Sequence, residues 1–189
     1  MLLMKDIILD GHPTLRQRAK EVNLPLSKED LDTLRQMMDL VENSQNDEMV
    51  EKYKFRPSVG LAAPQINQSK KMFVMKTADE NFKNLHKYAV VNPKIISFSE
   101  EKTYLSGGEG CLSVDEEITG LVERSKRIKA RVNLVDLETG ETTQVILKLN
   151  GFPGVVFQHE YDHLLGVLFV DKMKEYLPDI EPIEFGVNA

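Results

Sequence analysis

Hydrophobic residues follow a helical period early in the chain and a strand period later, which predicts a fold with both kinds of element. The helical pattern begins after Ser27, whose position three residues before Asp30 resembles a capping box. We predict an amphipathic helix from about residue 28 to the mid-forties. The next stretch, Asn43 to Lys54, has few apolar positions and is predicted to be a mobile, solvated loop. The residues at helical spacing are Leu31, Leu34, Met38 and Val41.

Strand patterns begin beyond Val59, with short β-rich runs at Met72 to Met75 and Tyr88 to Val91. Apolar and polar residues then alternate over residues 128–134 and 145–149, on either side of a turn at Thr139-Gly140. This alternation predicts a hairpin with one face in water.

A second helix is predicted late in the chain, where Pro153 suits a first turn and Gly166 can end the element. Strands that are neighbours in sequence, followed by this helix, indicate an α+β fold in which antiparallel β-sheets pack around the helix. No linker divides the chain, so we expect a single domain over residues 1–189.

Composition narrows the class of protein. The net charge is -6, which argues against a protein that coats nucleic acid or anionic lipid. The sequence has one Cys, which cannot form an intrachain disulfide. The charged residues Lys5 and Asp6 interrupt the apolar run that an export signal needs, so we expect no such signal here. The longest nearly apolar stretch, Leu164 to Val170, is far shorter than the roughly 20 residues of a membrane span. We therefore expect a soluble cytoplasmic protein.

The strongest chemical signal is His159-Glu160-Tyr161-Asp162-His163, inside the predicted late helix. Residues four apart share a helix face, so both imidazoles can reach one ion, while Glu160 lies about 100° round and can face a water molecule. The pattern predicts two metal ligands and a general base. The plainer interpretation is a helix whose His residues only form hydrogen bonds in the core.

A catalytic metal usually has three protein ligands, so a third must be found. Phe169 stands where the long metalloprotease signature has its third His. Downstream, Glu175, Glu181 and Glu184 lie in a Pro-interrupted acidic tail without a helix to present them. The remaining donor is Cys111. A lone Cys is more often a small buried hydrophobe, but the glycines just before it allow the close backbone approach expected beside a metal or substrate.

Three segments together, in this order along the chain, resemble the peptide deformylase family, enzymes that remove the N-formyl group from newly made bacterial polypeptides. Pro64 and the long insertion before it resemble the Gram-positive-type members. Ser58 departs from the family's usual Gly, which affects the backbone shape expected before Val59. The segments are Gly60-Leu61-Ala62-Ala63-Pro64-Gln65, Glu109-Gly110-Cys111-Leu112-Ser113 and His159-Glu160-Tyr161-Asp162-His163.

The resemblance implies a metal held by Cys111, His159 and His163, with Glu160 as the general acid and base. It suggests iron(II) in the cell, with zinc, nickel or cobalt able to occupy the same site. Ligand type alone, one thiolate and two imidazoles, favours zinc.

The resemblance also implies how a formylated substrate binds. The side-chain amide of Gln65 and the backbone N–H of Leu112 would polarise the formyl oxygen, and the peptide would lie extended beside Gly60 as an added strand. Glu109 would pair with Arg124 to brace the Cys111 loop. The pocket for the methionine side chain is assigned to Val59, Phe152, Val155 and Val156, although the last three are equally compatible with ordinary helix core.

Two other functions fit parts of the pattern. A metallopeptidase would share the two-His helix but leaves Cys111 without a role. A domain with a purely structural metal would need four protein ligands, and neither His12 nor His86 sits in ligand spacing.

The expected partners are formylmethionyl nascent polypeptides. A transient contact with the ribosome is a further hypothesis. No membrane partner and no specific nucleic-acid site are expected. A basic stripe on the predicted hairpin favours a solvated strand face over an RNA site; it consists of Lys126, Arg127, Lys129 and Arg131.

Overall fold

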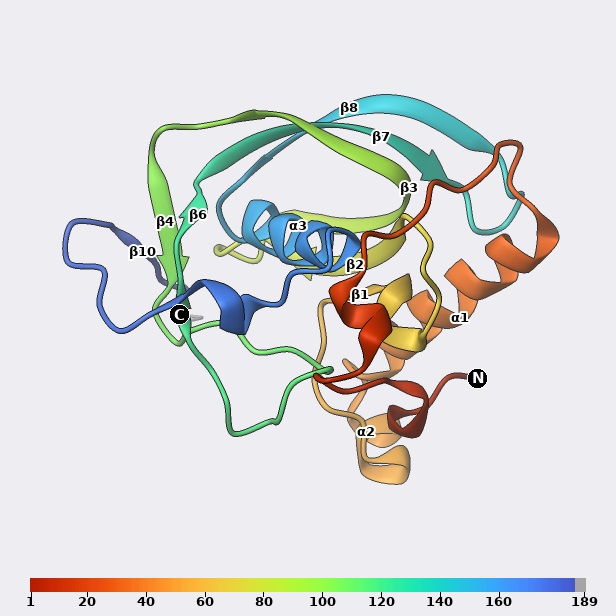
Figure 1. The fold of residues 1–189 in the computed structure, drawn as a ribbon, viewed down its shortest axis with the longest axis horizontal. Helices are drawn as coiled ribbons and strands as arrows, with labels where there is room; N and C mark the ends of the chain where they lie inside the picture. Colours follow the sequence, from red (N-terminus) through yellow and green to blue (C-terminus); the bar gives the residue numbers. More distant parts are fainter. Residues whose placement is uncertain (186–189) are drawn as a thin grey trace.

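The computed structural model describes residues 1–185 and contains one dominant antiparallel sheet (Figure 1). Its strand order is β1-β2-β3-β7-β8, and β3, β7 and β8 arch over the helix α3. These observations confirm the α+β class. The five strands are β1 (Gly60–Ala62), β2 (Met72–Ala78), β3 (Leu85–Phe98), β7 (Arg127–Val135) and β8 (Thr142–Asn150).

The remaining elements are shorter or lie outside this sheet. The second sheet has the order β10 (Pro182–Ile183), β4 (Lys102–Leu105), β6 (Arg124–Ser125), and a third pairs β5 (Leu121–Val122) with β9 (Met173–Lys174). The helices are α1 (Lys28–Asn43), α2 (Asp47–Tyr53) and α3 (Gly151–Leu164). The 3-10 turns are η1 (Met4–Asp6), η2 (Pro13–Arg16), η3 (Ala63–Ile66) and η4 (Phe169–Lys172). None of the helices in residues 1–185 combines the length and apolar character needed to cross a bilayer.

Strand β2 is buried on both faces, which places it between two helices. Met72 and Val74 belong to the same core cluster as the apolar face of α1, whereas Phe73 and Met75 pack with α3. Successive side chains of a strand point to opposite faces, so the alternation follows from the strand geometry. The ring of Phe73 meets Phe157 of α3 edge-on, with centroids 5.0 Å apart. The sheet and α3 therefore form one rigid support for the residues between them.

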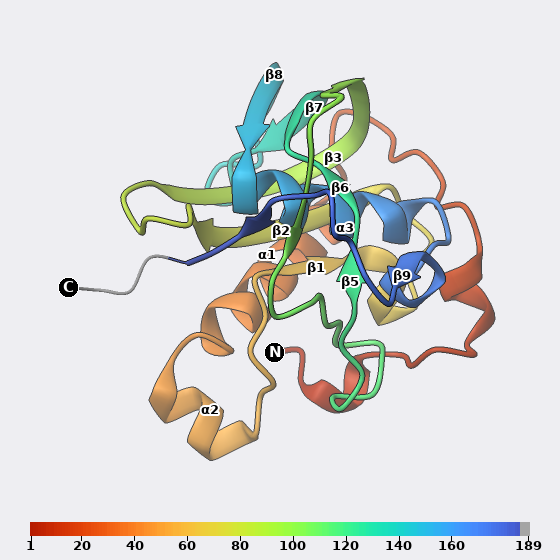
Figure 2. The same ribbon diagram turned by 90° about the vertical axis from the view of Figure 1, so that its left-hand side faces the viewer.

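Helix α1 confirms the first helical prediction, and its N-cap is the Ser27 side chain, which accepts from the Asp30 N–H. The loop predicted over 43–54 is wrong for residues 47–53, which form α2. The Asn46 side chain caps this helix by accepting from Met49 N–H. The apolar residues that pack α2 against the core cluster are Met49, Val50 and Tyr53. Figure 2 shows α2 and the end of α1 on the side of the molecule away from β8.

The hairpin is confirmed, and in its register Ile128 pairs with Leu149 and Ala130 with Leu147. Helix α3 begins at Gly151, which places Pro153 in its first turn as predicted. It ends before Gly166, which has φ +75°, and a side chain there would overlap the backbone of Arg16. Only glycine suits both the conformation and the space.

Candidate active site

Helix α3 carries the two imidazoles of the motif on one face. The rings of His159 and His163 are 5.1 Å apart between centroids, as the four-residue spacing predicts. His163 is almost completely buried, and the side chain of His159 is 13% exposed. Because α3 is packed against β1 and β2, these rings have little freedom to move.

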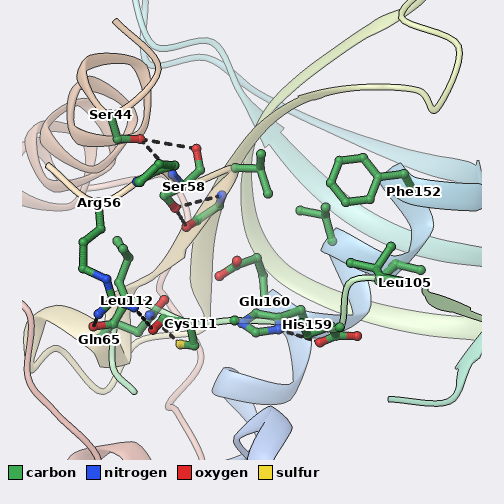
Figure 3. Close-up of a pocket in the computed structure, with 18 of the residues that line it drawn as sticks. Ser44, Arg56, Ser58, Gln65, Leu105, Cys111, Leu112, Phe152, His159 and Glu160 are labelled. Carbon is green, nitrogen blue, oxygen red and sulfur yellow. Dashed lines mark hydrogen bonds and ion pairs between the residues drawn. The ribbon is translucent and has the colours of Figure 1, made fainter. Parts of the chain in front are cut away.

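The loop containing Cys111 brings a sulfur to the same point. Cys111 Sγ lies 3.4 Å from Nε2 of His163, and one donor atom from each of Cys111, His159 and His163 lies within 4.8 Å of the other two. Figure 3 shows Cys111 beside His159, with Glu160 above them. A thiolate and two imidazoles are donors that divalent transition metals bind, so the three residues fit a single ion.

A buried chain of charges lies behind this cluster and orients it. Glu109 accepts two hydrogen bonds of 2.8 Å from Arg124 and lies 2.8 Å from Nδ1 of His159. Arg124 also donates to Asp162 at 2.5 Å, and Lys172 donates to Asp162 at 2.7 Å. The contact with Glu109 engages Nδ1 of His159 and so fixes the orientation of the ring, with Nε2 on its other side. The predicted pairing of Glu109 with Arg124 is confirmed.

Burial and hydrogen bonds shift the pKa values of the ionisable groups around the cluster. Burial lowers the pKa of His159, but its hydrogen bonds with Cys111 and Glu109 outweigh burial, and the pKa lies well above the usual value. Burial holds the pKa of His163 well below its usual value, with His159 adding to the effect. Burial opposes ionisation of Glu109, yet the hydrogen bonds from Arg124 and His159 lower its pKa to about 2.

Unlike Glu109, Glu160 forms no ion pair within the described residues. It is 4% exposed, Oε2 has no hydrogen-bond partner within the described residues, and burial raises its pKa to about 7. A carboxyl that changes protonation near neutrality suits a general acid and base. Its Oε1 lies where a Cβ of Gly60 would stand, so β1 needs a glycine here to approach α3.

Two hydrogen-bond donors lie close to Cys111. The Oε1 atom of Gln65 accepts from Ala62 N–H at 2.9 Å, which turns the amide nitrogen towards Cys111 Sγ at 3.4 Å and Ser113 Oγ at 3.2 Å. The backbone N–H of Leu112 donates to no acceptor in the hydrogen bonds of residues 1–185. Both donors therefore lie next to the metal-donor cluster.

A cavity of about 430 Å³ opens over these groups. The residues that the sequence singled out for the site line it, except His163 and Arg124, which are buried away from it. Sequence reasoning missed Arg56, Ser44, Gln45 and Leu105 on its wall and Asp162 and Lys172 behind it. Asp162 lies three residues after His159 on α3, and this spacing alone indicates that the two side chains share a face of the helix. The predicted residues on the wall are Val59, Gly60, Gln65, Cys111, Leu112, Phe152, Val155, Val156, His159 and Glu160.

Replacing Arg124 by Leu should destabilise the fold by about 3–5 kcal/mol, because it leaves the carboxylates of Glu109 and Asp162 buried without their shared cation. The Arg124 side chain is 2% exposed. Urea unfolding followed by circular dichroism measures the change. Arg127→Leu is the matched control, since its ion pair with Glu101 is exposed and should contribute much less. Equal losses in the two variants would contradict the structural role of the buried chain.

The fold and these groups define a hydrolase with a buried glutamate beside a cluster of thiol and imidazole donors. The model of the polypeptide deformylase family matches residues 4–178. A peptide deformylase 2 of Bacillus cereus is 50% identical over 189 residues, covering 97% of this chain and 100% of that protein. The chain therefore belongs to the peptide deformylase family, hydrolases that remove N-formyl groups.

Further relatives agree. A peptide deformylase of Halalkalibacterium halodurans is 50% identical over 189 residues, covering 100% of this chain and 98% of that one. Among solved structures, a peptide deformylase from Thermotoga maritima is 37% identical and covers 89% of this chain and 96% of its own, with a TM-score of 0.65. The relatives from Bacillus and Staphylococcus bear out the resemblance to the Gram-positive-type members.

Proposed function

We propose that the chain acts as one catalytic domain that removes the N-formyl group from formylmethionine at the start of newly made polypeptides, releasing formate. The single observation that carries the proposal is the position of the buried, unpartnered Glu160 carboxylate beside Cys111, His159 and His163, in one cavity. A metallopeptidase would share the two-His helix but would give Cys111 no function.

Cys111, His159 and His163 would hold one divalent ion, iron(II) in the cell with zinc, nickel or cobalt as substitutes. A divalent ion held by such donors lowers the pKa of a bound water molecule towards neutrality and polarises a carbonyl. Glu109 supports the ligand set by fixing the orientation of His159 through the 2.8 Å contact at Nδ1.

Glu160 moves the proton. Its free Oε2 accepts a proton from the attacking water molecule and later delivers it to the amine of the departing methionine. The amide of Gln65 and the N–H of Leu112 donate hydrogen bonds to the formyl oxygen as negative charge develops on it. Donors of this kind contribute about 3–4 kcal/mol each in other acyl-transfer enzymes.

The remaining wall of the cavity would bind the peptide. Strand β1 is an edge strand, so an extended peptide can add beside Gly60 by displacing the Ser58 hydroxyl, which donates to the Gly60 oxygen at 2.6 Å. The methionine side chain would enter the apolar part of the cavity, which is lined by Val59, Phe152, Val155 and Val156.

Formate release from formyl-Met-Ala, compared with an acetylated and an unformylated peptide of the same sequence, tests this function. The metal-loaded protein should release formate from the first substrate and cleave no internal peptide bond in any of them. A protein that holds one ion per chain but releases no formate would contradict the proposal. Cleavage within the peptides would favour the metallopeptidase.

Gly60→Ala should lower kcat by roughly 10²-fold, because the new Cβ displaces the carboxylate of Glu160 by about the ångström that matters in a reacting site. Steady-state kinetics of formate release measures the effect, with a thermal melt to show that the fold persists. Gly107→Ala is the control, since a Cβ there meets no atom within 4 Å. An active Gly60→Ala variant would show that Glu160 does not need its present position.

A further inference from the structure

Arg56 holds the loop that carries Cys111 through three backbone carbonyls. Its Nη2 donates to the Cys111 oxygen at 3.1 Å, and its Nη1 donates to the oxygens of Leu112 at 3.3 Å and Val114 at 2.9 Å. Figure 3 shows the Arg56 side chain reaching from the α2 side of the cavity to Leu112 and Cys111. One planar guanidinium therefore bonds to three of the four carbonyls from Cys111 to Val114.

The carbonyl of Cys111 and the N–H of Leu112 belong to the same peptide group. That group is planar and trans, so its C=O and N–H point in opposite directions. Since Arg56 fixes the direction of the Cys111 oxygen, it also fixes the direction of the Leu112 N–H. This N–H has no acceptor among the hydrogen bonds of residues 1–185, although Leu112 is only 5% exposed.

We propose that Arg56 is a positioning residue that aims the Leu112 N–H at the oxygen of the substrate carbonyl. The inference rests on the proposed function, in which this N–H is one of two donors to that oxygen. It assigns a role in the reaction to the segment that follows α2, which no motif of the sequence indicated.

The position of Arg56 is itself fixed from both sides. Phe55, before it, is 3% exposed and belongs to the same core cluster as Leu112. Ser58, two residues after it, donates its N–H to the Ser44 hydroxyl at 3.1 Å. The guanidinium is thus attached to a support that is separate in sequence from the Cys111 loop.

Other contacts of the loop do not replace this one. The N–H of Val114 donates to the Cys111 oxygen at 3.1 Å, but this bond lies within the loop and moves with it. The ion pair of Arg56 with Glu116 is 3.7 Å long, and the Glu116 side chain is 72% exposed, so it contributes little to the position of the guanidinium. Asp10 N–H donates to the Ser113 oxygen at 2.7 Å and the Gln65 amide donates to the Ser113 hydroxyl at 3.2 Å, so both also hold the loop, but neither bonds to the peptide group that joins Cys111 and Leu112.

Arg56→Met keeps the aliphatic part of the side chain and removes all three hydrogen bonds. We expect kcat for formate release to fall roughly 10- to 100-fold, because a poorly aimed donor keeps only part of the 10²–10³-fold contribution of a well-placed one. KM should stay within about twofold, and metal content should match the wild type. Arg56→Lys, which can still donate to one or two of the carbonyls, should give an intermediate kcat.

Arg35→Met is the matched control, because Arg35 also donates to two consecutive carbonyls, of Leu137 at 2.7 Å and Glu138 at 3.0 Å, far from the cavity. It should lose stability but keep kcat. The inference is overturned if Arg56→Met keeps the wild-type kcat, if its loss is matched by Arg35→Met, or if the loss tracks a loss of metal. An inactive wild type would instead overturn the proposed function itself.

Discussion

Replacing Glu160 by Gln is expected to lower the rate of formate release by roughly 10²–10⁴-fold, the usual contribution of a positioned acid and base. The amide has the same shape but cannot accept the proton of the attacking water molecule. Since Glu160 is buried with one oxygen unpartnered, removing its charge should not destabilise the fold. Single-turnover kinetics on formyl-Met-Ala, with metal content measured on the same sample, gives the result.

Glu141→Gln is the control for this experiment, because Glu141 is exposed in the turn of the β7–β8 hairpin, away from the cavity. It should behave as the wild type. Deformylation at the wild-type rate by Glu160→Gln, with the metal still bound, would remove Glu160 from the role of base and leave the proton transfer to another group.

Replacing Cys111 by Ala is expected to weaken metal binding by roughly 10²–10³-fold. Metal binding worth about 10–16 kcal/mol over four ligands corresponds to about 2.5–4 kcal/mol for each one. Activity at low free metal should fall by the same factor, because the remaining two imidazoles do not complete a catalytic site. Competition with a chelator of known affinity measures the dissociation constant directly.

His86→Ala is the matched control, since the ring of His86 contacts Tyr88 and lies outside the group of metal donors found in residues 1–185. Its metal affinity should equal that of the wild type. If Cys111→Ala bound the ion as tightly as the wild type, the sulfur would not be a ligand, and the third ligand would have to be sought among other residues.

Local patterns predicted the elements that support the site. The helical spacing after Ser27, the alternation of the β7–β8 hairpin and the four-residue spacing of His159 and His163 are properties of neighbouring residues, and the structure contains all three. Helix α2 was missed because a seven-residue helix is set by its cap at Asn46 and by packing against the core, not by a long periodic pattern.

Contacts between distant segments were predictable only where a family motif carried them. Cys111 was the donor that remained after the other candidates were considered, and Glu109 and Gln65 were assigned from the resemblance, since no spacing rule brings a loop at 107–113 to a helix at 151–164. The bonds from Arg124 and Lys172 to Asp162, and from Arg56 to the Cys111 loop, depend on how the segments pack. The hydrogen-bond partners of such polar side chains are set by the tertiary packing, so they cannot be predicted from the sequence alone.

The most direct test of the account is a crystal structure of anaerobically purified protein, with anomalous diffraction recorded on both sides of the absorption edge of the bound metal. The account predicts one ion per chain, coordinated by Cys111 Sγ and one nitrogen each of His159 and His163, with Glu160 facing its open side. An active protein whose ion lies on other residues would contradict it.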